Sequence, residues 1–412
     1  MKGNNWDARY AMLRRELEDS GVDVDGVEAS LKLQRIETPS WGYADSGTRF
    51  GTHKMPGAPT NVREKIEDAA VTHRYTGIAP AVALHIPWDM VDDWKDLSEF
   101  ACGHRIEIGA VNPNLFQDYD YRFGSFAAES AAVRRKAVEH VVDCIAIMRE
   151  VGSRTLSLWF ADGTNFPGQG DFRTRKHRFA EALAEVHGHL DAGETMLVEY
   201  KPFEPASYHT DIADWGMANA FCQKAGDRAK VLIDLGHHLQ GANIEHIVAF
   251  LADEGRLGGF HFNNRKYADD DLTTGSINPY ELFLIYTELV KLERAGAGGD
   301  IAYMIDESHT LKNKIGEMIQ SLVSLQAAYA KALIVNWEGL GKAQDANDLI
   351  GAEEIYKSAF AVDVRPLLWK VRTELDLPDP IDPVRGFMES TYAETAARER
   401  HDSRSALDDN PR

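Results

Sequence analysis

Cysteine is scarce in this sequence: there are three in 412 residues, and none belongs to a CxxC pair. An odd, scattered set excludes a disulfide framework and shows no thiolate zinc spacing. We therefore expect Cys102, Cys144 and Cys222 to be reduced core thiols of a cytoplasmic protein.

Long apolar runs are also missing. The opening segment, MKGNNWDARYAMLRREL, has no apolar signal core, and no window reaches the ~18 apolar residues of a membrane span. Positive charge is in deficit, with 45 Lys and Arg against 65 Asp and Glu, a net charge of −20. Because such a surface repels phosphate backbones, we expect neither a membrane protein nor a nucleic-acid binder. The acidic excess by itself indicates only solubility.

Short apolar runs rich in β-branched residues are present throughout, and eight of them are typical of strands. They are residues 31–38, 79–85, 105–111, 154–160, 195–200, 230–235, 258–262 and 301–305. Amphipathic stretches lie between them, at 128–149, 174–190, 212–224, 244–254 and 279–294. Such alternation favours either a doubly wound sheet or a closed α/β barrel.

Two regions lie outside this alternation. Residues 1–28 are predicted to form an N-terminal helical segment. Residues 335–412 are predicted to form a C-terminal helical extension with a frayed polar end, used for packing on the barrel or on a neighbouring subunit. Residues 29–334 would then form the catalytic unit.

Polar side chains end most of the predicted strands, and they decide between the two folds. They are His85, Trp159, Glu199 with Lys201, Asp234 with His237, His261, and Asp306 with Glu307. A barrel enzyme carries its site at the C-terminal ends of all its strands, whereas a doubly wound sheet concentrates it at one switch point. The sequence therefore predicts a (β/α)8 TIM barrel with helical additions at both ends.

Each of these residues also has a simpler structural interpretation. Glu199 and Lys201 share a strand face, and a salt bridge between Glu199 and a neighbouring Lys or Arg would be enough to explain the pair. Asp234 and Asp306 could cap helices, His261 could be a hydrogen-bonded core residue, and Asp269 to Asp271 could be a solvated acidic turn.

Taken together, the set favours a metal centre. Five carboxylates, those of Glu199, Asp234, Asp269, Asp271 and Asp306, would repel one another without cations. With His237 and His261 they make seven candidate ligands, too many for one ion and suitable for two. This oxygen and imidazole set suits Mn²⁺, Co²⁺ or Mg²⁺, with Zn²⁺ less favoured in the absence of thiolate.

Seven motifs carry a family resemblance. They are PSWGYADSGTRF, LHIPWD, WFADGTNFPGQGDF, EYKPFEP, DLGHH, GGFHFNNRKYADDDL and MIDESH. Through them the chain resembles the xylose-isomerase-like metal barrels, and most closely the L-rhamnose isomerases of broad aldose specificity. The likeness covers roughly residues 35 to 310 and is weaker in the tail.

The resemblance implies two Mn²⁺ ions per subunit. Glu199, Asp234, His261 and Asp306 would hold the first ion, His237, Asp269 and Asp271 the second, and Asp234 would bridge them. Asn264 stands where many relatives carry Asp, which would alter ligand orientation without abolishing metal binding.

The resemblance also implies conversion of L-rhamnose to L-rhamnulose, with activity on other aldoses, by a metal-assisted 1,2-hydride shift in a homotetramer. Lys201, Asp271 and His85 would be catalytic, with Lys201 at O1 and His85 assisting ring opening. The substrate-binding residues implied are His85, Trp159, Lys201, Trp41, Phe50 and Phe116.

Three alternatives remain open at this stage. A metal-dependent ketose 3-epimerase would need two carboxylate bases on opposite faces of the sugar, which the Asp269 and Asp271 pair with Lys201 disfavours. A barrel nuclease of the apurinic-site type is opposed by the net charge of −20. A non-catalytic barrel used for assembly does not explain the ligand set, and an enediol route instead of the hydride shift stays open.

Overall fold

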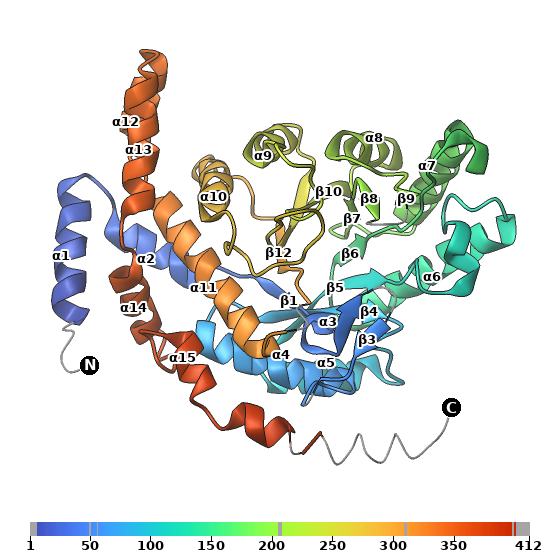
Figure 1. Ribbon diagram of the computed structural model, residues 1–412, viewed down its shortest axis with the longest axis horizontal. Coiled ribbons are helices and arrows are strands. Elements are labelled where there is room, and N and C mark those ends of the chain that lie inside the picture. Colours follow the sequence, from blue (N-terminus) through green and yellow to red (C-terminus); the bar gives the residue numbers. More distant parts are fainter. Residues whose placement is uncertain are drawn as a thin grey trace.

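The computed structural model describes residues 6–48, 51–55, 57–204, 208–308, 311–397 and 399–400. Eight parallel strands close into a barrel in the order β1-β12-β11-β10-β7-β6-β5-β4 (Figure 1). They are β1 (Glu37–Pro39), β4 (Ala81–Ile86), β5 (Glu107–Pro113), β6 (Thr155–Leu158), β7 (Thr195–Glu199), β10 (Ala229–Asp234), β11 (Leu257–Phe262) and β12 (Ala302–Ile305). The predicted (β/α)8 barrel is confirmed. Two short hairpins lie outside it, β2 (Ser46–Thr48) with β3 (Gly51–His53), and β8 (Phe203–Glu204) with β9 (Tyr208–His209).

Helices surround the barrel, and each begins at a residue suited to capping. They are α4 (Val62–Thr76), α5 (Trp94–Gly103), α6 (Ala131–Glu150), α7 (Phe172–Gly188), α8 (Trp215–Ala225), α9 (Ile244–Asp253), α10 (Pro279–Arg294) and α11 (Lys314–Leu333). Their N-cap residues are, in order, Asn61, Asp93, Ser130, Asp171, Asp214, Asn243, Asn278 and Asn313. Each cap side chain accepts a hydrogen bond from an amide of the first turn, which satisfies a donor that the helix itself leaves unpaired.

The first predicted strand is only partly correct. Residues 31–33 belong to helix α2 (Val24–Leu33), and β1 begins at Glu37. Val24, Val27 and Leu31 are buried at helical spacing, so the apolar start of LKLQRIET completes a helix face. The prediction of three core thiols is also partly wrong, since Cys144 and Cys222 are buried but Cys102 is exposed at the end of α5.

Helices from the N-terminal and C-terminal regions of the chain pack together on one side of the barrel (Figure 1). Helix α1 (Trp6–Asp19) lies against α14 (Arg365–Glu374), and α15 (Pro383–Met388) packs on α4 and α11. The short helix α3 (Ser40–Tyr43) follows β1 directly. Helices α12 (Trp337–Asp345) and α13 (Leu349–Ala361) pack against each other and stand away from the barrel as a helical hairpin (Figure 1).

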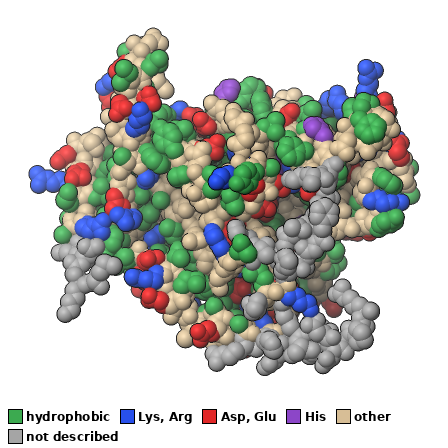
Figure 2. Space-filling view, viewed as in Figure 1, with side chains coloured by type: hydrophobic (Ala, Val, Ile, Leu, Met, Phe, Trp, Pro, Cys, Tyr) green, Lys and Arg blue, Asp and Glu red, His purple; other side chains and the backbone are tan. Residues whose placement is uncertain are grey.

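Acidic and basic side chains are interspersed on the face of the molecule shown in Figure 2. Within the described ranges, no single helix has the length and hydropathy to cross a membrane, and only α11 with α12, joined at a 60° bend, pass that test as a pair.

Candidate metal centre

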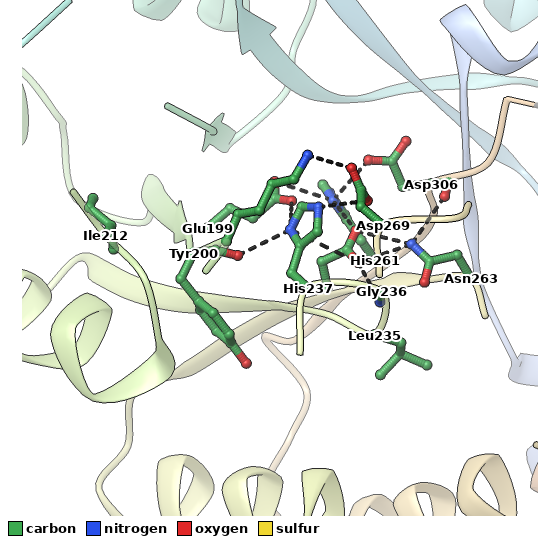
Figure 3. Close-up of polar contacts among 12 residues, drawn as sticks. Glu199, Tyr200, Ile212, Leu235, Gly236, His237, His261, Asn263, Asp269 and Asp306 are labelled. Atoms are coloured by element: carbon green, nitrogen blue, oxygen red, sulfur yellow. Dashed lines mark hydrogen bonds and ion pairs between the residues drawn. The ribbon is translucent and has the colours of Figure 1, made fainter. Parts of the chain in front are cut away.

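Four strand ends bring a carboxylate or imidazole to one point inside the C-terminal mouth of the barrel. Glu199 ends β7, Asp234 ends β10, His261 lies in β11 and Asp306 follows β12. Each offers one ligand atom, and these atoms all lie within 4.8 Å of one another (Figure 3). In the part of the chain that the structure describes, this is the one group of its kind. It is the same set that the resemblance assigns to the first cation.

The imidazole of His261 shows how the group fits a cation. Its Nδ1 lies 3.4 Å from Glu199, 3.7 Å from Asp234 and 3.3 Å from Asp306. This buried nitrogen makes no hydrogen bond to a described residue. The nitrogen faces three carboxylates and bonds to none of them. Ligand atoms around a shared metal ion have this arrangement. The donor set, one imidazole and three carboxylates, suits a divalent ion such as Mn²⁺ or Mg²⁺.

The second predicted ligand group lies beside the first. His237 Nδ1 is 3.0 Å from Glu199 and 3.0 Å from the Tyr200 carbonyl, while its Nε2 is 3.1 Å from Asp269. Asp234 faces both groups, with Oδ1 4.0 Å from His237 and Oδ2 3.7 Å from His261. Asp234 therefore lies between His237 and His261, with one carboxylate oxygen toward each imidazole.

Electrostatics in the centre reflect crowded negative charge. Burial raises the pKa of Asp234 to about 6, with help from the carboxylates of Glu199 and Asp306 and against the nearby imidazoles. Burial and the charges of Asp269, Asp306 and Asp234 raise the pKa of Asp271 well above its usual range. Burial would also raise the pKa of Glu199, but the imidazoles of His261 and His237 lower it to about 2. A bound cation would relieve this repulsion between neighbouring carboxylates and keep them ionised.

Lys201 stands at the edge of the centre, two residues beyond Glu199. Its ammonium pairs with Asp269 and lies 3.0 Å from Glu204. Although burial alone would lower its pKa, these two carboxylates raise it above the ordinary value, so the ammonium stays charged. No ion pair joins Lys201 to Glu199 among the described residues, so the simple pairing of the two is wrong.

Aromatic rings form a continuous wall beside the carboxylates. The Trp41 and His85 centroids are 5.4 Å apart, His85 and Phe116 are 5.8 Å apart, and Phe116 and Trp159 are 4.9 Å apart. The wall meets the metal centre at both ends, because Trp41 Nε1 donates to Asp306 at 2.9 Å and Lys201 Nζ lies 5.2 Å from the Trp159 ring. Burial lowers the pKa of His85 to about 3, so its imidazole is neutral. Phe50, the other predicted wall residue, lies outside the described residues.

Two site residues were not singled out from the sequence. Trp88, within the HIPWD motif, stacks on His85 with centroids 3.8 Å apart. Asn263 donates from Nδ2 to both carboxylate oxygens of Asp234, at 3.0 and 3.1 Å (Figure 3). Asn263 lies two residues after His261 and so on the same strand face. This spacing is the feature of the sequence that could have identified it as a site residue. The neighbouring Asn264 instead accepts hydrogen bonds from the amides of Ile277 and Asn278.

Comparison with known proteins agrees with this geometry. A family profile described as "Xylose isomerase-like TIM barrel" matches residues 67–284. A "probable sugar isomerase" of Rhizobium meliloti is 42% identical over 397 residues, covering 95% of this chain and 92% of the relative. A "probable sugar isomerase" of Mesorhizobium japonicum is 41% identical over the same shares.

Among solved structures, an L-ribulose 3-epimerase has a TM-score of 0.55 at 17% identity, and the match covers 74% of this chain and 98% of that one. At that identity the likeness concerns the fold alone. The profile match and the two long relatives show that the chain belongs to the xylose isomerase-like TIM barrel family.

Proposed function

We propose that this protein is a divalent-metal-dependent aldose–ketose isomerase that converts L-rhamnose to L-rhamnulose and accepts other aldoses. The observation that carries the proposal is the convergence of Glu199, Asp234, His261 and Asp306 within 4.8 Å, next to a charged lysine and an aromatic wall. The relatives called probable sugar isomerases support the reaction class. The choice of rhamnose rests on the motif resemblance.

Two cations would occupy the centre, with Mn²⁺ as the proposed metal. The first would be held by the four convergent residues, and the second by His237, Asp269 and Asp271. When bound, these ions would polarise two neighbouring oxygens of the open-chain sugar. The position of Asp234 between the groups supports its proposed bridging role.

The protein's own groups suggest how the sugar would be handled. The Lys201 ammonium would donate a hydrogen bond to O1 and stabilise negative charge there as a hydride passes from C2 to C1. His85, neutral and held between Trp88, Trp41 and Phe116, would accept a hydrogen bond from the sugar and assist ring opening. The aromatic wall would seat the C6 methyl group of rhamnose and exclude water. Asp271 is the proposed catalytic carboxylate: it would assist removal of the O2 proton before the hydride moves, and return of a proton to O1 would complete the ketose.

A ketose 3-epimerase is the main alternative, and product analysis separates the two. Protein loaded with Mn²⁺ is incubated with aldoses that include L-rhamnose, allose, mannose and lyxose, and ketose formation is measured. An epimerase would instead convert a ketose to its C3 epimer without forming an aldose. Transfer of deuterium from C2 of the aldose to C1 of the ketose supports the hydride shift, whereas washout to solvent supports the enediol route.

The matched variants for this assay are Asp234→Ala and Asp253→Ala. Asp253 has the same side chain as Asp234, but it is exposed at the end of α9 and is not one of the predicted ligands. Activity that survives chelation, or that persists in Asp234→Ala, would contradict the metal-dependent function.

We further propose that the protein is a homotetramer. In it, the 335–412 extension contacts neighbouring subunits and residues 29–334 form the catalytic unit. Size-exclusion chromatography with light scattering tests the number of subunits.

A further inference from the structure

The segment that carries Asp269 and Asp271 is an irregular loop between β11 and α10. Its two ends are tied together, because Asn264 and Leu272 exchange backbone hydrogen bonds of 2.7 and 2.9 Å. Asp271 has a φ of +44°. An L residue adopts this left-handed conformation at a cost in free energy, which the contacts around it must offset. Asp269 is also held by Lys201 and His237, so the placement of the two carboxylates depends in part on what anchors the loop beyond Leu272.

One such anchor is the buried carboxylate of Glu307, the residue after Asp306. Glu307 Oε1 accepts hydrogen bonds from the Thr274 amide at 2.7 Å and from the Thr274 hydroxyl at 2.6 Å. Ser321, on α11, donates to the same carboxylate at 2.7 and 2.8 Å. Glu307, Thr274 and Ser321 are all fully buried. A buried acceptor that satisfies three neutral donors fixes the segments that carry them.

Glu307 therefore joins two parts of the metal centre that come from different strands. Asp306, the residue before it, belongs to the first ligand group. Thr274 lies three residues after Asp271, which belongs to the second. We propose that Glu307 is a positioning residue that docks the 264–274 loop on the end of β12 and so sets the placement of the second cation's ligands relative to the first's. This inference rests on the proposed two-cation function.

The experiment compares four variants by calorimetric titration of the metal-free protein with Mn²⁺. In Glu307→Ala and Ser321→Ala we expect one of the two cations, assigned to His237, Asp269 and Asp271, to lose about 10- to 100-fold in affinity, while the other stays within about threefold. Glu307→Gln should retain the second cation, because its amide oxygen accepts from the same Thr274 donors. Ser324→Ala is the matched control, since Ser324 lies on the same helix and donates only to its own helix at Gln320.

Hydrogen exchange of the metal-free protein gives a readout that does not involve the cations. Amides of residues 265–272 should exchange faster in Glu307→Ala and Ser321→Ala than in wild type or Ser324→Ala, with β12 and α11 unchanged. Unchanged loop exchange, or an equal loss of both cations, would overturn the positioning role. If Glu307→Ala does not fold, Ser321→Ala decides. If wild type binds fewer than two cations, the two-cation function fails, and the exchange comparison still decides the role of Glu307.

Discussion

A buried ion pair between Lys65 and Asp89 lies next to His85 of the aromatic wall and connects the ends of two barrel strands. Lys65 Nζ on α4 lies 2.5 Å from Asp89 Oδ1, and the two side chains are 7% and 0% exposed. The other oxygen of Asp89 accepts from the His85 amide at 2.8 Å and from the Ser40 hydroxyl at 2.5 Å. One carboxylate thus ties the end of β1 to the end of β4. We predict that replacing Lys65 by Met strongly destabilises the fold.

The expected magnitude follows from burial. Lys65→Met keeps the volume of the side chain but leaves the Asp89 carboxylate out of water with only two neutral donors. Removing one partner of such a pair costs about 3–5 kcal/mol. Arg63 lies on the same helix and pairs with Asp96, but these side chains are 39% and 61% exposed. Arg63→Met should therefore cost about 0–1 kcal/mol. In Lys65→Met with Asp89→Asn both charges are gone, and most of the loss should be recovered.

The assay is urea unfolding of the metal-free proteins at pH 7, followed by circular dichroism, with the free energies combined in a double-mutant cycle. We expect a coupling energy of at least about 2 kcal/mol between positions 65 and 89. If Lys65→Met is no less stable than Arg63→Met, or if the coupling energy is close to zero, the buried pair does not hold this part of the fold.

Four further predictions concern the site and its surroundings. Removing divalent metal with EDTA should abolish isomerisation and lower the Tm in calorimetry, because the carboxylates then repel one another, and Mn²⁺ should restore both. Lys201→Met should lower kcat about 10²- to 10³-fold in steady-state assays, since it removes a donor to charge on the substrate. Trp41→Phe keeps the ring but loses the hydrogen bond to Asp306, which should weaken Mn²⁺ binding about 10-fold in calorimetry, whereas unchanged binding would deny that contact a role. Burial raises the pKa of Glu37 from 4.5 to about 7, so the wild type loses stability as pH rises from about 4.5 to about 7. Glu37→Gln should match it at pH 5 and be about 1–2 kcal/mol more stable at pH 8 in urea unfolding.

Much of the fold was accessible from the sequence because the barrel repeats one local pattern. Runs such as KVLID and GGFHF combine β-branched or aromatic residues with a ligand type at the end, and both became barrel strands. Where charges interrupted the apolar run, at LKLQRIET, the prediction failed over residues 31–33. Val24, Val27 and Leu31 have helical spacing in the sequence, and this spacing, not the short apolar run, determines the structure of residues 31–33.

The contacts that hold the ligands were less accessible, for a physical reason. Alternation along a strand places Asn263 on the face of His261, but its contact with Asp234 on the neighbouring strand depends on register across the closed barrel. The sequence shows Glu307 only as the residue that follows Asp306 at the end of a predicted strand. Its bonds to Thr274 and Ser321 join residues 33 and 14 positions away in the sequence, and no local pattern encodes them.

The capping residues strengthen the case for cations more than the ligand types do. From the sequence, helix capping was the strongest alternative role for Asp234 and Asp306. In the structure, α9 is capped by Asn243 and α11 by Asn313, each several residues further along the chain. Asp234 and Asp306 are therefore not the caps of these helices, yet Asp234 is buried among other carboxylates. Burying a carboxylate among carboxylates costs free energy that nearby imidazoles offset only in part. A fold that gives every barrel helix its own cap and still keeps this cluster is best explained by a bound divalent cation.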